Sequence, residues 1–478
     1  MKFEKIFKGR FVPGILAALL LMLAAVPVPA SAASYVKVML NGQVLNFDVP
    51  PVIENNRTLV PFRKISEAIG ATVNWDENTR TITAYKGDKT VILKVGNSTA
   101  YVNQNPVKLD APPVMRKNRT LVPLRFFTEA FGAAVSWENS TDTVFIDTGE
   151  KLSKYILGYY YSQSYDDFMK NYDRMSSTAV KWYTLDDNGD VTDNYASPRW
   201  IKVPDGYEEV IKLSKEKGLK IFMLLFEMDG NKLQKVLSTM ESRKRLVNQI
   251  MTVVEREGYD GVNIDFEFLK AQDKDKFNEF IKGLSEALHA GGKSLNLSLP
   301  VKTEKADWWP GYDYETLGKY SDFVVLMAYD KNPASPEPQS GIDWVEEVVD
   351  YAIARIPAEK VVLGIGYYGY DWASNGSKYT VLVTRNGTTI PGLLFADELK
   401  EKYGLKLTLD KKSGLAYGTY TDANGVFHQI WMESEASVDA KAKLVIRKGL
   451  KGIALWRLGY TTPSLWDTLL SNFKPAKE

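Results

Sequence analysis

From Lys154 to the C-terminus, short apolar runs alternate with segments of helical period, and this rhythm most strongly limits how the chain can fold. Buried strands are expected at residues 155–160, 179–185, 220–226, 261–267, 294–300, 322–330, 361–367 and 452–456. Strands that alternate with helices form a parallel sheet covered on both faces, and eight such units suit a (β/α)8 barrel. The predicted fold class of this part is therefore α/β, a TIM barrel.

The rhythm breaks between the seventh and eighth strands. Residues 373–428 are rich in Gly, Thr and Tyr, and they predict a small α+β insertion in which strands dominate. The barrel and its insertion are expected to occupy residues 150–478. A chain of 478 residues is too long for one compact core, so at least one further domain is expected before the barrel.

An internal repeat fills that preceding part. The hexapeptide Asn-Arg-Thr-Leu-Val-Pro at residues 56–61 recurs 62 residues later at 118–123, and Trp75 and Trp137 match at the same offset. Each unit predicts a strand, an Asn-Arg turn, a short helix and a strand pair. We expect one small α+β domain at residues 34–149, built from repeats at about 36–86 and 98–148.

Four arginines of this domain have two interpretations. They could contact anions, or they could bond turn carbonyls and acids within the fold, and the second interpretation is favoured. They are Arg57, Arg63, Arg119 and Arg125.

The first residues have the pattern of a secretory signal. Four basic residues up to Arg10 precede an apolar run of 12 residues from Ile15 to Val26, and Ala30-Ser31-Ala32 supplies small residues for cleavage. A retained anchor is the alternative, but the run is too short to span a bilayer comfortably. We expect a signal peptide at residues 1–33 and a secreted or cell-wall-associated bacterial protein, with no membrane segment after cleavage.

Charge and ligand content exclude several classes of function. The net charge of +1 gives no field that would attract nucleic acid. The chain has no cysteine, and its two histidines, His289 and His428, form no ligand pattern, so neither a metal nor a cofactor is predicted. Export without disulfides is compatible with a Gram-positive cell surface.

Residues 260–267 read Asp-Gly-Val-Asn-Ile-Asp-Phe-Glu and carry the chemistry. Side chains alternate along a strand, so Asn263, Asp265 and Glu267 share one face, with Glu267 at the C-terminal end. An antiparallel strand with one wet face would also alternate, but the flanking helical patterns favour a strand buried on both faces. Carboxyl groups directed into such a core are costly unless they are paired, hydrogen-bonded or used in catalysis.

Further candidates lie at the ends of other strands. Tyr329 and Asp330 end the sixth strand, and Trp456 ends the eighth. Either aromatic residue alone could be a packing residue. Barrel active sites form at the C-terminal strand ends, however, so these positions together with Glu267 indicate one site at the barrel mouth.

The octapeptide resembles the Asp-Gly-x-Asp-x-Asp-x-Glu signature of glycoside hydrolase family 18. Residues 327–330, Met-Ala-Tyr-Asp, resemble the strand-six motif of that family, and Trp456 matches its strand-eight tryptophan. The resemblance covers about residues 151–470 and implies substrate-assisted, retaining hydrolysis of β-1,4 bonds in N-acetylglucosamine-containing glycans.

The resemblance also implies roles for individual residues. Glu267 would be the acid and base, Asp265 would hold the acetamido N–H of the sugar, and Tyr329 would bond the acetamido oxygen. These three form the expected catalytic set. The expected substrate-binding set is Asn263, Met327, Asp330, Trp456 and Tyr159.

Two departures from the family pattern indicate a branch. Asn263 stands where many chitinases have Asp, and the third strand ends in Phe-Glu-Met-Asp-Gly at 226–230 instead of Ser-x-Gly-Gly. In both features the chain resembles the branch of the family that acts on bacterial peptidoglycan, which includes spore-cortex N-acetylglucosaminidases. The expected substrate is an N-acetylated polysaccharide, peptidoglycan in preference to chitin. A chitinase and a non-catalytic carbohydrate-binding chitinase-like protein are the alternatives.

The duplicated domain resembles the copper amine oxidase N-terminal-like, or stalk, repeats. The resemblance rests on the Asn-Arg-Thr-Leu-Val-Pro hexapeptide and on the following Gly-Ala-x-Val-x-Trp. Copper is not implied, because the repeat contains no His or Cys. The resemblance implies a non-catalytic module of exported bacterial proteins, and we expect cell-wall attachment through residues 35–148.

Overall fold

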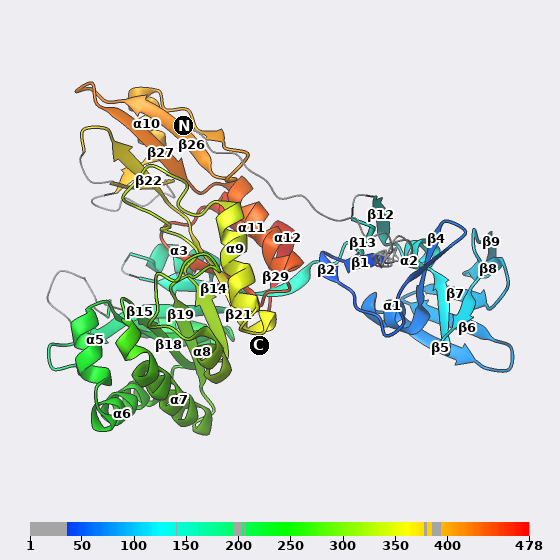
Figure 1. The fold of residues 1–478 in the computed structure, drawn as a ribbon, viewed down its shortest axis with the longest axis horizontal. Coiled ribbons are helices and arrows are strands. Elements are labelled where there is room, and N and C mark those ends of the chain that lie inside the picture. The colour runs from blue at the N-terminus through cyan, green and yellow to red at the C-terminus, as the bar shows by residue number, and fades with distance from the viewer. Residues whose placement is uncertain are drawn as a thin grey trace, which may run out of the picture.

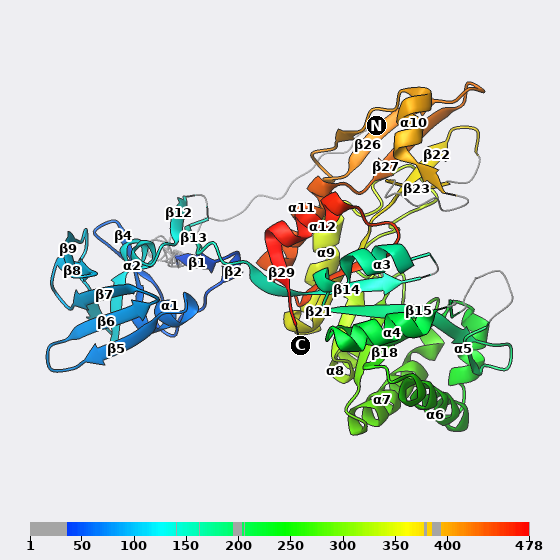
Figure 2. The same ribbon diagram turned by 180° about the vertical axis from the view of Figure 1, so that it is seen from behind.

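The structure is a computed structural model that describes residues 36–477, apart from 140, 162, 195–202, 205, 377–379 and 385–392. The predicted signal peptide at residues 1–33 lies outside the described residues. Figure 1 and Figure 2 show an N-terminal domain and a larger barrel, which meet where β2 (Gln43–Val44) lies against α11 (Glu435–Arg447). Within the described residues, no helix combines the length and apolar character that crossing a membrane requires.

Two copies of one unit build the N-terminal domain, as the repeat predicts. In each copy a hairpin leads into a short helix, and a further strand follows. Strands β4 and β11 pair antiparallel at the centre and join the two hairpins in one four-stranded sheet. Besides β2, the elements are β1 (Lys37–Leu40), β3 (Val52–Glu54), β4 (Arg57–Pro61), α1 (Phe62–Ala68), β5 (Thr72–Asp76), β6 (Thr81–Lys86), β7 (Lys89–Lys94), β8 (Thr99–Val102), β9 (Asn105–Lys108), β10 (Val114–Arg116), β11 (Arg119–Pro123), α2 (Leu124–Ala130), β12 (Ala134–Glu138) and β13 (Thr143–Asp147).

Eight parallel strands close the predicted barrel. The first of them pairs with both the second and the eighth, so the sheet has no free edge within the barrel. The strands are β14 (Leu152–Tyr160), β15 (Ser177–Leu185), β17 (Lys220–Glu227), β18 (Gly261–Phe266), β19 (Ser294–Leu299), β20 (Phe323–Leu326), β21 (Val361–Gly366) and β28 (Gly452–Trp456). The short β16 (Val191–Thr192) and β29 (Phe473–Pro475) extend the sheet outside the barrel.

The sixth strand is shorter than the predicted 322–330. The ladder to β19 continues only as far as the N–H of Met327, which bonds the carbonyl of Leu299 at 3.0 Å. The next two amides bond to carbonyls two residues back, and Asp330 has a left-handed φ of 58°. The chain therefore turns out of the sheet before Tyr329, and this turn directs the motif residues toward the barrel mouth.

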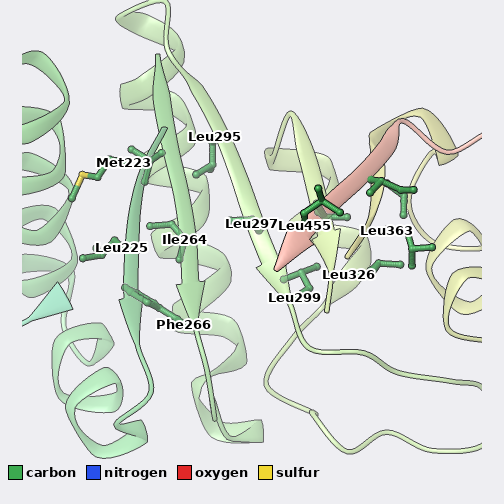
Figure 3. Packing of buried hydrophobic residues seen from close by; sticks show 14 of the residues in the cluster. Met223, Leu225, Ile264, Phe266, Leu295, Leu297, Leu299, Leu326, Leu363 and Leu455 are labelled. Atoms are coloured by element: carbon green, nitrogen blue, oxygen red, sulfur yellow. The ribbon is translucent and has the colours of Figure 1, made fainter. Parts of the chain in front are cut away.

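Side chains of the strands form two cores. Those on the inner face fill the barrel, among them Leu157, Leu224 and Val325. Those on the outer face pack under the helices, and Figure 3 shows part of this cluster, with Ile264, Phe266 and Leu297 among the labelled residues. Because both faces are covered, the strands are apolar along most of their length, which explains why periodicity detected them.

Helices cover the outside of the barrel. The longest, α6, begins with a capping box between Thr239 and Ser242 and ends at Gly258, whose φ of 69° favours glycine. Besides α11, the helices are α3 (Tyr165–Asn171), α4 (Tyr207–Glu216), α5 (Gly230–Leu237), α6 (Met240–Glu257), α7 (Lys274–Ala290), α8 (Tyr314–Tyr320), α9 (Ile342–Ile353) and α12 (Pro463–Asn472).

The described residues of the insertion between β21 and β28 form a six-stranded sheet with one helix, which agrees with the α+β prediction. Its elements are β22 (Gly369–Ala373), β23 (Thr380–Val383), β24 (Leu394–Phe395), α10 (Ala396–Tyr403), β25 (Thr408–Leu409), β26 (Ala416–Thr421) and β27 (Phe427–Met432).

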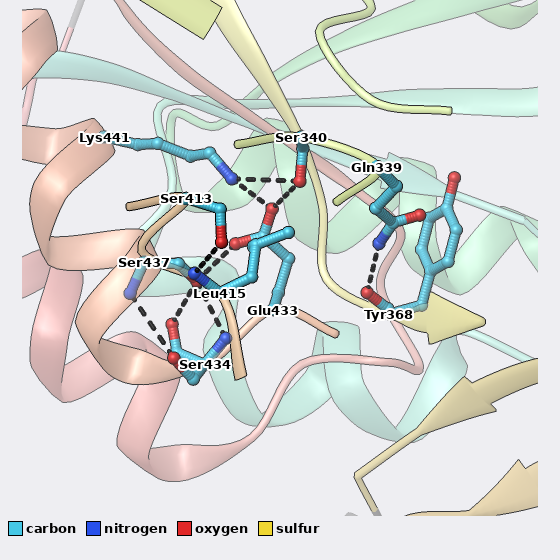
Figure 4. Close-up of polar contacts among 9 residues, drawn as sticks. All are labelled: Gln339, Ser340, Tyr368, Ser413, Leu415, Glu433, Ser434, Ser437 and Lys441. Atoms are coloured by element: carbon cyan, nitrogen blue, oxygen red, sulfur yellow. Dashed lines mark hydrogen bonds and ion pairs between the residues drawn. The ribbon is translucent and has the colours of Figure 1, made fainter. Parts of the chain in front are cut away.

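A buried polar cluster anchors the insertion to the barrel. The carboxylate of Glu433, directly after β27, accepts hydrogen bonds from Ser340 and Ser437 and pairs with Lys441 on α11 (Figure 4). Glu433 and Lys441 are both almost fully buried, so this ion pair is shielded from solvent.

Candidate active site

Strand β18 directs its polar side chains into the barrel, as the alternation predicts. Val262, Ile264 and Phe266 pack outward in the helix-covered core. Asn263 and Asp265 are buried on the opposite face. Glu267 follows the last strand residue, and its N–H bonds the carbonyl of Glu227 on β17 at 2.8 Å, which fixes it at the rim.

A cavity of about 570 Å³ opens at this rim. Six of the eight predicted site residues line it, and they come from strands β18, β20 and β28 or directly follow them. They are Asp265, Glu267, Met327, Tyr329, Asp330 and Trp456. Its volume lies within the range of about 300–1,000 Å³ that is typical of small-molecule sites.

The other two predicted residues, Asn263 and Tyr159, lie beneath the cavity and do not line it. The Tyr159 hydroxyl lies 2.8 Å from the hydroxyl of Ser298, and Ser298 donates to the Asn263 side-chain oxygen at 2.9 Å. The ring of Tyr159 meets the Trp456 indole edge-on, with centroids 5.6 Å apart. In this geometry the two residues support the floor of the site from below.

Asp265 faces a buried cation that sequence analysis missed. The Nζ of Lys181, on β15, lies 3.4 Å from Asp265 Oδ2. Burial raises the pKa of Asp265 above its usual 3.8, while the charge and hydrogen bond of Lys181 oppose this rise. In the described residues, Oδ1 of Asp265 is buried and has no hydrogen-bond partner, so it remains available to a bound ligand.

Lys181 also lies over two aromatic rings. Its Nζ is 3.4 Å from the ring centroid of Phe226 and 4.6 Å from that of Trp456. Such cation–π contacts stabilise the ammonium group where solvent is excluded. The sequence contains a signal for Lys181. It is a lysine inside a predicted buried strand, and it lies two residues after Ala179, on the same inner face.

Tyr329 and Asp330 line the cavity just beyond the end of β20. Burial raises the pKa of Tyr329 well above 10, so its hydroxyl stays protonated and can donate a hydrogen bond at neutral pH. Oδ1 of Asp330 accepts hydrogen bonds from Tyr368 at 2.5 Å and Tyr370 at 2.6 Å. Burial raises the pKa of Asp330, and those two hydrogen bonds oppose the rise. Asp330 therefore connects the site to the start of the insertion.

Aromatic residues that were not predicted extend the cavity wall. Trp308 and Trp309 follow β19, and Trp308 is 52% exposed. The ring of Trp309 lies 5.4 Å from that of Phe268, which follows Glu267. Two adjacent tryptophans in the loop that follows a predicted barrel strand are a signal that could have identified them. Flat exposed rings at a cavity mouth suit stacking against sugar rings.

No group of three or more His, Cys, Asp or Glu residues in the described part of the chain is arranged to hold a metal ion.

Two other concavities, of about 1010 and 510 Å³, lie on the N-terminal domain. Neither contains the converging carboxyl and tyrosine groups found at the barrel mouth.

Comparison with known proteins identifies the families of the two domains. The pattern of the family described as Glycosyl hydrolases family 18 matches residues 135–460, and that of the Copper amine oxidase N-terminal domain matches residues 39–146. The chain is 28% identical to the uncharacterized glycosylase YvbX of Bacillus subtilis (strain 168), over 65% of the chain and 88% of that protein. It is 29% identical to the cortical fragment-lytic enzyme of the same organism, over 56% of the chain and 63% of that enzyme.

Solved structures show the same fold. A chitinase from Chromobacterium violaceum superposes with a TM-score of 0.59 at 28% identity, covering 67% of the chain and 99% of the chitinase. The Bacillus megaterium spore cortex-lytic enzyme SleL gives 0.60 at 22% identity, covering 78% of the chain and 80% of SleL. The family pattern spans more than half of the chain, and its motif residues surround one cavity. The chain therefore belongs to glycosyl hydrolase family 18 and is a glycosidase related to spore cortex-lytic enzymes and chitinases.

Proposed function

We propose that this glycosidase is an exported β-N-acetylglucosaminidase that cleaves β-1,4 bonds of peptidoglycan by substrate-assisted, retaining catalysis. The observation that carries this proposal is the shared cavity of Glu267, Asp265 and Tyr329, in which the buried Oδ1 of Asp265 has no hydrogen-bond partner among the described residues. An acetamido group of a bound sugar offers the N–H that this oxygen lacks and the carbonyl that Tyr329 can bond.

The proposed reaction has two steps. In the first, Glu267 gives its proton to the glycosidic oxygen, the bond from that oxygen to the anomeric carbon breaks, and the acetamido oxygen of the same sugar attacks that carbon. Asp265, as a carboxylate, stabilises the positive charge on the resulting bicyclic ring. In the second step, Glu267 takes a proton from water, and the oxygen of that water opens the ring with overall retention.

Other carboxylates are poorly placed to act as the nucleophile of a two-carboxylate mechanism. Asp265 is held by Lys181, and Oδ1 of Asp330 is occupied by two tyrosine hydroxyls. A nucleophile supplied by the substrate removes the need for a second free carboxylate. The mechanism therefore limits the substrate to a glycan with an N-acetylated sugar at the cleaved bond.

Two features favour peptidoglycan over chitin. Among the relatives are cortical fragment-lytic enzymes, whose name refers to the lysis of cortical fragments, although the chain spans only 63% of the first of them. In addition, Asn263 replaces the acidic residue of many chitinases, and it bonds Asn296 and Ser298 inside the barrel.

The decisive test is the release of muropeptides from purified sacculi by the wild type and by Glu267→Gln. We expect the variant to lose at least about a thousandfold in rate, because it cannot donate a proton. Glu255→Gln is the matched control, since Glu255 is exposed on α6 and does not line the cavity, and it should retain full activity. Equal release by Glu267→Gln and the wild type would refute the role of Glu267.

A chitinase is the second candidate, and the aromatic wall of Trp308, Trp309 and Phe268 favours it, because a neutral chain can stack there. Turnover of chito-oligosaccharides and of sacculi at equal enzyme concentration separates the two. Faster turnover of chito-oligosaccharides would assign the enzyme to chitin.

Export is proposed from the basic and apolar start of the chain, residues 1–33. Expression of the full sequence in a Gram-positive host, followed by fractionation and N-terminal sequencing, tests it. Mature protein in the wall or medium that begins near Ala33 or Ser34 is expected, and protein that stays intact inside the cell would overturn the proposal.

A further inference from the structure

The two copies of the N-terminal domain are related by a local twofold axis. Strands β4 and β11 pair so that Val60 lies opposite Val122, which is the same position of the other copy. Leu59 pairs with Pro123, and Pro61 pairs with Leu121, which is the reciprocal match. A groove that is lined by residues of both copies is therefore expected to occur twice, at positions related by this axis.

Two grooves of the domain obey this symmetry. They measure about 1010 and 510 Å³, and each is lined by residues of both copies. The residues that correspond between the grooves are Trp75 and Trp137, Arg63 and Arg125, Glu67 and Glu129, Asp48 and Asp110, and Arg119 and Arg57.

The fold accounts for some of these repeated residues. Arg57 reaches Asp110 of the other copy at 2.7 Å, and Arg119 reaches Asp48 at 2.7 Å. Both arginines also donate to the carbonyl of the preceding asparagine. These two arginines therefore bond within the fold, which is the interpretation that the sequence favours, and they join the two copies.

The fold does not account for the second pair of arginines. Arg63 is exposed and has no hydrogen bond or ion pair within the described residues, and Arg125 has only a 3.9 Å contact with Glu129. The neighbouring position differs between the copies, Lys64 in one and Phe126 in the other. Both copies thus keep an exposed arginine that makes no side-chain hydrogen bond within the described residues, so a ligand in the groove can reach its guanidinium.

Each groove also contains one tryptophan ring. Trp75 and Trp137 are half-buried, and their indole N–H groups bond Glu77 and Asn139 at the groove edge. Each groove thus combines a ring face with a guanidinium and a carboxylate. This combination suits a sugar, whose C–H face stacks on the ring while its hydroxyls and acetamido group bond the polar side chains.

Charge in the larger groove argues for a neutral ligand. Its basic residues are matched by an equal number of acidic residues, namely Arg63, Lys64 and Arg119 against Asp48, Glu67 and Glu77. Such a lining has little net attraction for a polyanion, whereas uncharged hydroxyls and amides can bond both kinds of group.

We propose that the two grooves are equivalent binding sites for N-acetylglucosamine-containing glycan, so that the N-terminal domain is a bivalent glycan-binding module. The choice of glycan rests on the proposed function of the barrel. Two linked sites bind a polymer far more tightly than either site alone, with gains of about 10²–10⁴. The module would hold the enzyme on a polymeric substrate while the barrel cleaves it.

The test measures co-sedimentation of the full chain with purified sacculi in a Glu267→Gln background, so that the glycan is not consumed. Trp75→Ala and Trp137→Ala should each weaken binding about tenfold, and the double variant about a hundredfold or more. Tyr85→Ala with Tyr101→Ala is the matched control, because these tyrosines are 41% and 42% exposed on the same domain and line neither groove. The control should bind like the parent.

A second variant protects the test against misfolding. Arg63→Ala with Arg125→Ala removes only exposed side chains and should also weaken binding, by about tenfold, without changing thermal unfolding. Unchanged sacculus binding by both double variants would overturn the proposal. Hydrolysis of a soluble chito-oligosaccharide, measured with Glu267 intact, should be the same in all groove variants. If neither the parent nor any groove variant hydrolysed the chito-oligosaccharide, that result would instead count against the proposed function of the barrel.

Discussion

The buried pair of Lys181 and Asp265 allows a quantitative test of the active site. At 3.4 Å and an effective dielectric constant of about 20, their attraction is about 332/(20 × 3.4), or roughly 5 kcal/mol. Lys181→Met removes this attraction. Asp265 can then become neutral, at a cost of about 1.4 kcal/mol per pH unit above its ordinary pKa of 3.8, or at most roughly 4 kcal/mol at pH 7. We expect the free energy of barrel unfolding to fall by about 3–4 kcal/mol at pH 7.

The loss should depend on pH with a definite sign. Burial raises the folded-state pKa of Asp265, so its ionisation opposes folding as pH rises through and above the ordinary pKa of 3.8. Without Lys181 the folded-state pKa rises further. The difference in unfolding free energy between Lys181→Met and the wild type should therefore be largest near pH 7 and shrink toward pH 4.

The assay is urea unfolding of Lys181→Met, Asp265→Asn and the double variant, at pH 4 and pH 7. The double variant buries no unpaired charge. The unfolding free energy that it loses should therefore be smaller than the sum of the two single-variant losses, by about 2 kcal/mol or more. Lys305→Met is the control, since its pair with Glu347 is exposed and should contribute less than about 1 kcal/mol. Additive losses within about 0.5 kcal/mol would refute the reasoning.

Three further substitutions test other parts of the structure. Trp308→Ala should raise the KM for chito-oligosaccharides about tenfold with little change in kcat, because it removes a stacking face, and a fall in kcat alone would contradict that role. Lys441→Met should cost about 3–5 kcal/mol in urea unfolding, because it leaves Glu433 buried without its cation. Gly452→Ala should prevent soluble expression or lower Tm by more than about 10 °C, since the added Cβ would lie 1.8 Å from the Tyr155 carbonyl oxygen; a Tm near that of the wild type would show that β28 can shift.

Much of the fold was predictable because burial on both faces leaves a strong local signal. Each of the eight predicted apolar segments overlaps a barrel strand, and the match is closest at the eighth, residues 452–456. The sixth was predicted too long, because Tyr329 and Ala328 are as apolar as a strand although their amides bond two residues back. Periodicity reports burial, and it does not report where the backbone leaves the ladder.

The candidate site was predictable where one short motif contains the chemistry. Asp265 and Glu267 are two residues apart in one predicted strand, so alternation alone places them on the same face. Asn263 shares that face, yet it lies too deep to line the cavity, because depth along a barrel strand depends on how neighbouring strands are staggered.

The sequence by itself determined the strand order, the duplicated domain and the acids of β18, since each follows from patterns within a few tens of residues. Only the tertiary structure decided that Lys181 pairs with Asp265 across 84 residues, that Tyr368 and Tyr370 bond Asp330, and that two copies of one repeat form matching grooves. The physical reason is that barrel closure and strand register bring inward side chains of different strands to the same level. No local periodicity contains that information.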